Sequence, residues 1–194
     1  AVWAIMGPNI GTTITGQLVA LDIGWIAPLF AFIGVIMMLF IKNIKANEIG
    51  KVLCGFGVLF IGLNMMSSSM APLRENEAFI GLMSKFSNPL LGILIGLVFT
   101  AIIQSSSASV AILQALAISG VVSLDSAVYI LFGQNIGTCA TALLASIGTN
   151  RAAKRTMLIH LIFNVLGTTM FTIICMLTPL TSFVSNLTPS NGAQ

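Results

Sequence analysis

Long apolar stretches make up most of this chain, and short polar segments separate them. The stretches run over roughly 1–21, 25–41, 49–70, 89–103, 108–120, 125–147 and 156–178. Only 7% of the 194 residues are charged, against roughly 25% in an ordinary soluble domain, and 57% are hydrophobic. So few charged side chains cannot cover the surface of a water-soluble protein of this size. The sequence therefore predicts an all-α integral membrane protein.

Segment length separates the stretches into two kinds. A helix needs about 20 residues to cross ~30 Å of hydrocarbon. Five stretches can span the membrane, some of them with tilt or help from flanking residues. The pair at 89–103 and 108–120 is too short to do so comfortably. We expect residues 89–120 to form one re-entrant helical hairpin, which enters and leaves the membrane on the same side.

The charged residues lie between the stretches or at their ends, and two of the loops are basic. The positive-inside rule places these loops, around 42–51 and 151–155, on the cytoplasmic side. Basic cytoplasmic loops also explain the net charge of +3, so this charge does not indicate binding of nucleic acid. Two loops on the same side must be separated by an even number of membrane crossings. The number is two if 89–120 is a hairpin, and it would also be even if 89–120 formed two full spans. On this topology 1–21 and 125–147 cross the membrane in opposite directions.

An internal repeat links these two oppositely directed segments. Residues 1–18 and 127–144 share nine identities at a constant offset of 126, with the common core GxNIGTxxT. Gly and Thr are common in membrane helices, but that does not explain identical spacing at so many positions. A motif that crosses the membrane in both directions is an inverted repeat, the architecture typical of secondary transporters.

The repeated motif predicts helices that are discontinuous at membrane depth. Two glycines flank an asparagine in each copy, and Pro8 precedes Asn9 in the first, so we expect both helices to break at mid-span and name 125–147 a broken helix. Such breaks persist only inside protein or beside a wet cavity. Freed carbonyls, amides and hydroxyls offer the oxygen ligands that a hard cation such as Na⁺ prefers. Asn135, Thr138 and Thr141 recur every third residue, so they can share one side of the segment.

The polar cluster QSSS, Gln104 to Ser107, lies at the tip of the predicted hairpin. Serine caps helix N-termini well, and the free N–H groups there favour phosphate-like oxyanions. Sodium would instead use the serine hydroxyls, the Gln104 carbonyl and the last carbonyls of the preceding half-helix. Serines also hydrogen-bond between packed helices, but a glutamine and three serines between two half-length segments favour a binding site. No charged residue lies near the middle of any span, so co-bound cations would lower the cost of burying an anion.

Four segments together resemble one known family. QSSSAS at 104–109, GQNIGTCAT at 133–141, GPNIGTTIT at 7–15 and TNRAAKRTMLIHLIFN at 149–164 resemble the type II sodium-phosphate cotransporter family, bacterial branch. The resemblance covers essentially the whole chain. It implies a secondary transporter, not an enzyme, that takes inorganic phosphate inward with Na⁺ through two inverted repeats, each with a QSSS hairpin and a following broken helix. It implies no cofactor besides Na⁺ as the coupling ion.

The resemblance also assigns residues to the substrate and ion site. Hairpin-tip roles and unwound-helix roles of the second repeat fall on Gln104, Ser105, Ser106, Ser107, Asn135, Thr138 and Thr141. The equivalent positions of the first repeat are Asn9, Thr12 and Thr15. The ligands expected for Na⁺ are Gln104, Ser105, Ser106, Thr138 and Thr141. The expected partners are inorganic phosphate, Na⁺ and membrane lipid, in the bacterial inner membrane, and an oligomer is compatible with the sequence.

One part of the family pattern is missing. Gln104 precedes Gly133 by 29 residues, so the first QSSS should lie about 22 residues before Ala1. We therefore expect a fragment that is truncated at both ends, with 1–41 the C-terminal part of the first repeat and 42–194 the second. Such a fragment would hold half of the binding site and would not transport alone.

Two other interpretations stay open at this point, and a third is disfavoured. The same fold could carry another oxyanion, sulfate or a dicarboxylate, because sites at helix tips are chemically similar. The fragment could also be a degenerate half-gene or a non-transporting membrane scaffold. His160 beside abundant serines would suit an intramembrane serine protease, but the chain lacks the GxSxG setting of such a nucleophile.

Overall fold

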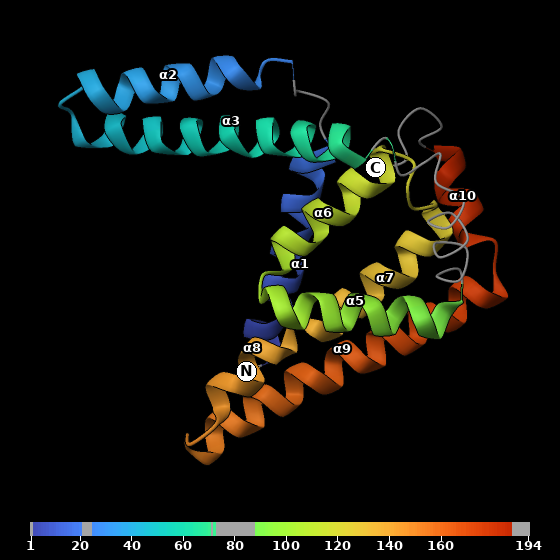
Figure 1. Cartoon of the computed structure of the whole chain (residues 1–194). Coiled ribbons are helices and arrows are strands. Elements are labelled where there is room, and N and C mark those ends of the chain that lie inside the picture. Colours follow the sequence, from blue (N-terminus) through green and yellow to red (C-terminus); the bar gives the residue numbers. More distant parts are fainter. Residues whose placement is uncertain (1, 21–24, 71, 73–87, 188–194) are drawn as a thin grey trace.

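The computed structural model describes residues 2–20, 25–70, 72 and 88–187 (Figure 1). Its helices are α1 Val2–Ala20, α2 Ala27–Phe40, α3 Ile44–Met70, α5 Pro89–Ile103, α6 Ser106–Ile118, α7 Leu124–Gly137, α8 Cys139–Ser146, α9 Arg151–Leu177 and α10 Leu180–Leu187. No strand occurs within these residues. The predicted all-α fold is confirmed.

Three helical segments in the described part of the chain are long and apolar enough to cross a membrane. They are Ile44–Met66, Leu124–Ser146 and Arg151–Leu177. Large hydrophobic side chains such as Leu39, Ile44 and Leu90 are exposed on the helix surfaces, as lipid-facing residues are. The 14-residue α2 is shorter than the full span predicted for 25–41, because Trp25 and Ile26 form a turn and the helix ends before Ile41.

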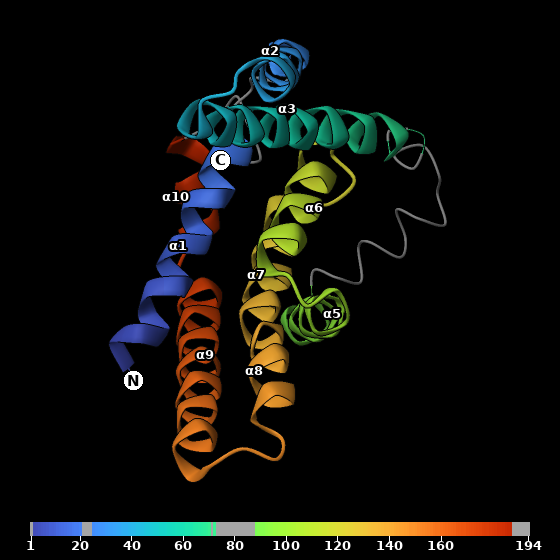
Figure 2. The ribbon, with the colours of Figure 1, turned by 90° about the vertical axis from the view of Figure 1, so that its left-hand side faces the viewer.

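Helices α1, α6, α7, α8 and α9 run side by side, and α2 and α3 lie across the upper ends of α1 and α6 (Figures 1 and 2). In both views α1 and the α7–α8 segment run in opposite directions. The side-chain contacts give the same order. From Thr12 to Gly16, the contacts of α1 advance towards the C-terminal end of α6, so these two helices are parallel. Gln134 of α7 contacts Ser109 of α6, and the earlier Ile130 packs with the later Leu113, so α7 is antiparallel to α6.

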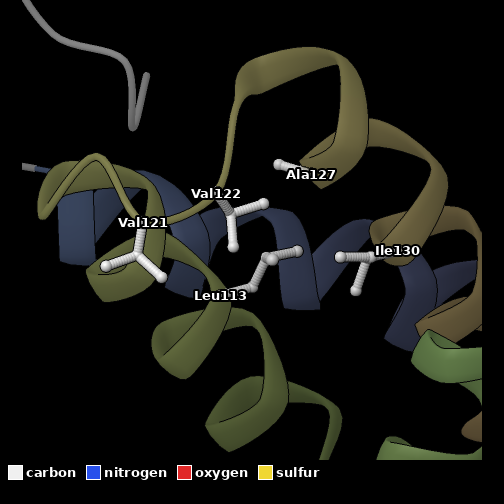
Figure 3. Packing of buried hydrophobic residues seen from close by; sticks show 5 residues of the cluster. All are labelled: Leu113, Val121, Val122, Ala127 and Ile130. Carbon is white, nitrogen blue, oxygen red and sulfur yellow. The ribbon is translucent and has the colours of Figure 1, made fainter. Parts of the chain in front are cut away.

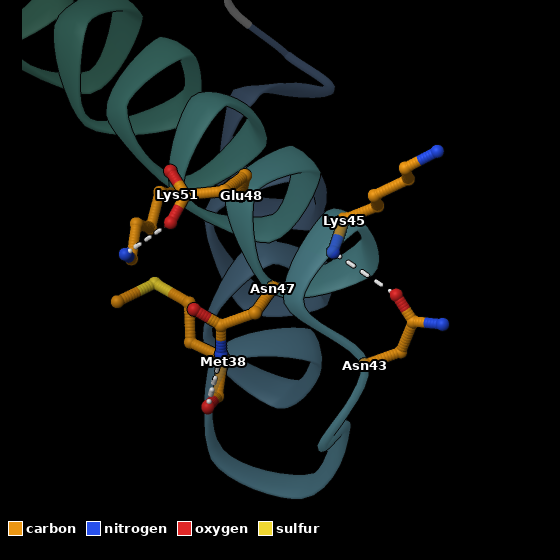
Figure 4. A network of polar contacts seen from close by, with 6 residues as sticks. All are labelled: Met38, Asn43, Lys45, Asn47, Glu48 and Lys51. Carbon is orange, nitrogen blue, oxygen red and sulfur yellow. Dashed lines mark hydrogen bonds and ion pairs between the residues drawn. The ribbon is translucent and has the colours of Figure 1, made fainter.

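Polar side chains close the turn between α2 and α3 (Figure 4). Asn43 accepts hydrogen bonds from the backbone N–H groups of Lys45 and Ala46, at 3.0 and 3.4 Å, and so satisfies the first turn of α3. Asn47 donates to the Met38 carbonyl at 2.9 Å, and the ammonium of Lys51 lies 2.6 Å from the Glu48 carboxylate. The basic segment 42–51 therefore comprises a short connection and the first two turns of α3, with its charged side chains exposed.

A small apolar core joins α6 to α7 (Figure 3). It consists of Leu113, Val121, Val122, Ala127 and Ile130, all of which are buried. Ser123 caps α7 by accepting a hydrogen bond from the Ser126 N–H at 3.4 Å. This core fixes the tight return of the chain between 119 and 124, so that α7 runs back antiparallel beside α6.

Glycines allow α5 and α7 to pack with their backbones in contact. A Cβ atom at Gly96 would meet the Ile130 carbonyl, and one at Gly133 would meet the Ile93 carbonyl. At Gly137 it would lie 2.5 Å from the Leu97 carbonyl oxygen and 2.9 Å from the Thr100 Cβ. These pairs advance along both helices together, so α5 and α7 are parallel. Small residues that permit such close approach are typical of helix pairs in membranes.

The two copies of the repeated motif differ in structure. The first lies within one continuous helix, α1, so the predicted break in that copy is wrong. The missing N–H of Pro8 frees the Ala4 carbonyl, yet the helix continues through this position. Thr12 and Thr13 donate to the Pro8 and Asn9 carbonyls at 3.0 and 3.3 Å, as helix side chains commonly do. The second copy is interrupted at Thr138 alone, whose backbone stays helical with φ −58° and ψ −27°. It is a local interruption between α7 and α8 rather than an extended unwound segment.

Gly133→Ala tests the backbone contact between α5 and α7. Because the added methyl meets the Ile93 backbone, which cannot rotate away, we expect a loss of about 1–3 kcal/mol or more in the free energy of unfolding. Thermal unfolding in detergent measures it. The control is Gly62→Ala in α3, where a Cβ meets no atom within 4 Å, and we expect a small gain in stability there. An unchanged melting temperature for Gly133→Ala would contradict the close packing.

Candidate functional site

The QSSS segment connects α5 to α6. Gln104 ends α5 in the left-handed region, with φ 58° and ψ 22°, and its N–H donates to the Thr100 carbonyl at 2.8 Å. Ser105 is the N-cap of α6, and its hydroxyl accepts from the Ala108 N–H at 3.3 Å. The predicted positions of the helix end and of the serine cap are confirmed. The two helices diverge from this connection instead of packing along each other, and α5 lies along α7 (Figures 1 and 2).

The second copy of the motif lies directly beside this connection. Gln134 is 2% exposed, and its amide donates to the Ser109 carbonyl at 3.1 Å, which ties α7 to the first turns of α6. One turn further along, Gly137 touches the last turns of α5 at Leu97 and Thr100. The interruption at Thr138 therefore comes next to the turn of α5 that ends at Gln104.

The first copy reaches the same place from α1. The hydroxyls of Thr12 and Ser106 lie 3.5 Å apart. One helical turn along α1, the Gln114 amide donates to the Gly16 carbonyl at 2.8 Å. These two polar contacts hold α1 against α6, so both copies of the motif flank the serines, although they are more than 120 residues apart in the sequence.

A chain of side-chain contacts also joins α1, α8 and α9. The Asn9 amide donates to the Asn164 carbonyl oxygen at 3.1 Å, and the Asn164 amide donates to the Cys139 sulfur at 3.2 Å and to the His160 carbonyl at 3.1 Å. Asn164 is 5% exposed and Cys139 is 3% exposed. A buried asparagine with all of these contacts fixes the position of three helices.

The structure brings some of the predicted site residues together and leaves others apart. Thr12 and Ser106 meet, and Thr138 and Thr141 are linked because Thr141 donates to the Thr138 carbonyl at 3.0 Å. Thr138 itself donates to the Gln134 carbonyl at 2.9 Å.

The remaining predicted residues are placed as follows. Gln104, Ser105, Asn135 and Thr141 are exposed, and Ser107 is half-buried in the first turn of α6. Asn9 points to Asn164 rather than to the serines. The side chain of Thr15 lies outside the described residues.

Sequence reasoning missed three polar residues whose side chains join the helices of this region: Gln114, Gln134 and Asn164. Each one is a polar side chain within an apolar helix. That signal was available in the sequence, because an amide or hydroxyl at membrane depth needs a partner. What the sequence did not show was which helix supplies the partner.

No charged residue lies in the QSSS segment or in α5 and α6, the two helices that it connects. The charged residues between 88 and 187 are Asp125, Arg151, Lys154 and Arg155, all of them in the first two turns of α7 or α9. The segment therefore offers hydroxyls, amides, carbonyls and the N–H groups of the first turn of α6. These groups can bind a cation through oxygen or an oxyanion through N–H and O–H.

Comparison with known proteins identifies the family. A sequence model of the Na⁺/Pi-cotransporter family matches residues 1–68 and 70–185. The chain belongs to this family. The family that the sequence motifs predicted is thus confirmed, and it is a family of transporters rather than of enzymes. No solved structure matches the chain.

Three relatives of this Na⁺/Pi-cotransporter chain illustrate its range. It is 32% identical over 189 residues to the uncharacterized protein YqeW of Bacillus subtilis, which covers 95% of this chain and 60% of YqeW. It is 31% identical over 168 residues to the "Putative inorganic phosphate export protein YjbB" of Escherichia coli, covering 86% of this chain and 31% of YjbB. It is 34% identical over 116 residues to human sodium-dependent phosphate transport protein 2B, covering 52% and 17%. The chain thus spans less than two thirds of each of these relatives.

Asn164→Ala tests the contact chain between α1, α8 and α9. Because it leaves the Asn9 amide without its partner, we expect a loss of about 1–3 kcal/mol in the free energy of unfolding. A double-mutant cycle with Asn9→Ala should give a coupling of about 0.5–1.5 kcal/mol. Thr169→Ala on the exposed face of α9 is the control and should change stability by less than about 0.5 kcal/mol. Additive effects of the Asn9 and Asn164 substitutions would show that the two side chains do not interact.

Proposed function

We propose that the complete protein carries inorganic phosphate across the bacterial inner membrane by symport with Na⁺, and that this chain supplies one half of the site. Membership of the Na⁺/Pi-cotransporter family supports the substrate and the ion. The match to bacterial relatives supports the localisation. The observation that carries the proposal is the meeting of Ser106, the first motif at Thr12 and the second motif at Gln134 in one neutral polar region.

The two motif-bearing segments are proposed to be the related parts of two inverted repeats. Residues 1–41 would be the C-terminal part of the first repeat, and residues 42–194 would be the second. Their opposite directions in the structure support this, as does the shared GxNIGTxxT pattern. We further propose that residues 89–120 are the re-entrant hairpin of the second repeat. Its two helices, of 15 and 13 residues, are each too short to span alone.

Coupling of phosphate to sodium follows from the electrostatics of the site. In the complete protein, a phosphate dianion enclosed among these neutral groups would lose its hydration without a fixed countercharge. Sodium ions bound through the Gln104 and Ser105 oxygens and the hydroxyls of Ser106, Thr138 and Thr141 would supply that charge. The first-turn N–H groups of α6 and Ser107 would then be available to phosphate oxygens. Obligatory coupling arises because neither charge is stable there alone.

The direction of transport has two candidates. The resemblance to sodium-phosphate cotransporters favours inward movement driven by the Na⁺ gradient. The 31% identity to YjbB, whose name describes phosphate export, favours outward movement. We propose inward symport, because the neutral site needs a co-bound cation and an inward Na⁺ gradient supplies one.

Radiolabelled phosphate flux in proteoliposomes that contain the complete protein tests this function. We expect uptake when Na⁺ is outside, little uptake when choline replaces it, and weak competition by sulfate or succinate. Equal flux with and without sodium would overturn the coupling. Strong competition by sulfate or succinate would change the substrate, and absence of any flux would favour a scaffold. Export driven by internal phosphate without Na⁺ would reverse the direction.

Gln104→Ala tests the role of the QSSS segment in this flux. The Gln104 side chain is exposed at the connection between α5 and α6, so its removal should leave folding intact. Losing one polar contact to a charged ligand costs about 1.5–3 kcal/mol, or roughly a 10- to 100-fold drop in flux at low phosphate. Gln17→Ala, which removes an exposed glutamine of α1, is the matched control and should transport normally. Equal fluxes for the two variants would remove Gln104 from the site.

A further inference from the structure

A sharp turn separates the short helix α10 from the membrane-spanning helix α9. Thr178 ends α9 in an extended conformation, with φ −128° and ψ 152°, which a following proline favours. Pro179 begins the next helix, because its carbonyl accepts a hydrogen bond from the Phe183 N–H at 2.9 Å. The chain changes direction here, and Figure 1 shows that α10 turns away from the line of α9.

Apolar and polar side chains lie on opposite faces of α10. The apolar face spans about 100° of the helix and has the i, i+3, i+4 and i+7 spacing of an amphipathic helix. It consists of Leu180, Phe183, Val184 and Leu187. The opposite face carries only hydroxyls and one amide, those of Thr181, Ser182, Ser185 and Asn186. No residue of α10 is charged.

The described part of the protein covers only one edge of this apolar face. Helix α10 contacts α7 and α9, and Leu180 at its start is half-buried. Phe183 and Leu187, on the other edge, are 60% and 65% exposed. Contact of these two side chains with water is unfavourable, so their surroundings decide what the face is for.

The length of α9 places α10 at the surface of the membrane. Its 27 residues extend over about 40 Å, whereas the hydrocarbon layer is about 30 Å thick. With the basic first turns of α9 at one surface, its last turn at Leu177 reaches the opposite surface, which is the outer one on the predicted topology. Because α10 begins at Leu180, it starts at the boundary between acyl chains and headgroups.

We propose that α10 is an interfacial helix that lies at the outer surface of the membrane, with Phe183 and Leu187 inserted among the lipid acyl chains. Amphipathic helices bind at this boundary with the apolar face towards the hydrocarbon. Because α10 contacts both α7 and α9, the inserted side chains hold the outer ends of these helices at the surface. An uncharged helix needs no anionic headgroup for this, and the surface is independent of the proposed phosphate site.

Spin labels on the two faces of α10 test the proposal in the complete protein, reconstituted in phosphatidylcholine bilayers after replacement of its native cysteines. Phe183→Cys and Leu187→Cys carry the label on the apolar face, and Ser182→Cys is the matched control on the polar face. Electron paramagnetic resonance measures collisions with oxygen, which concentrates in the bilayer, and with a nickel chelate, which stays in water. We expect the apolar-face labels to be accessible to oxygen and several-fold less accessible to nickel than the Ser182 label. Adding phosphatidylglycerol should change neither result.

Three results would overturn the proposal. High nickel accessibility of all three labels would mean that α10 lies in water. Low accessibility of the Phe183 and Leu187 labels to both oxygen and nickel would mean that protein, either another segment or a second copy, covers the apolar face. Protection from nickel that requires phosphatidylglycerol would mean that headgroup charge, rather than apolar insertion, holds the helix.

Discussion

The backbone contact between α5 and α7 is the constraint on which the rest of the structure depends. Gly96, Gly133 and Gly137 remove the side chains that would separate the two helices. Because the helices are parallel, their C-terminal ends arrive together, and the α5–α6 connection comes to lie beside the interruption at Thr138. Neither polar segment could reach the other if α5 and α7 packed at an ordinary distance of 8–10 Å set by larger side chains.

The interior of the described residues differs from a soluble core. Its largest fully buried side chains are polar, and many large hydrophobic residues are exposed on the outside. Lipid supplies no hydrophobic drive for helix association, so close packing and interhelical hydrogen bonds hold the helices together. The contacts of Gln114 with Gly16, Gln134 with Ser109 and Asn9 with Asn164 all act in this way. These amide side chains are uncharged, and so are Ser105 and Ser106. The lack of a fixed charge is the basis for proposing that phosphate and sodium bind together.

Much of this arrangement could be predicted from the sequence, and the failures have physical reasons. The lengths of the apolar segments predicted the helices and the connection at Gln104 and Ser105, because a polar cluster between two short apolar runs favours a connection between two helices. The break predicted at Pro8 and Gly11 does not occur, because the helix propensity of single residues ignores the packing of α1 against α6 and α9. The partners of Gln114, Gln134 and Asn164 could not be predicted, because they depend on which helices become neighbours. Periodicity within one helix carries no such information.

The central claim is that the first copy of the motif reaches the serines beside the second copy, and a disulfide between Thr12→Cys and Ser106→Cys tests it most directly. The two hydroxyls lie 3.5 Å apart, and a disulfide requires Cβ atoms about 3.5–4.5 Å apart. The substitutions are made in a background of Cys54→Ala, Cys139→Ser and Cys175→Ala, with Thr13→Cys and Ser106→Cys as the control pair. After mild oxidation and protease digestion, we expect mass spectrometry to find the Thr12–Ser106 peptides joined and the control peptides separate. Failure of the first pair to join, or equal joining of both, would contradict this account.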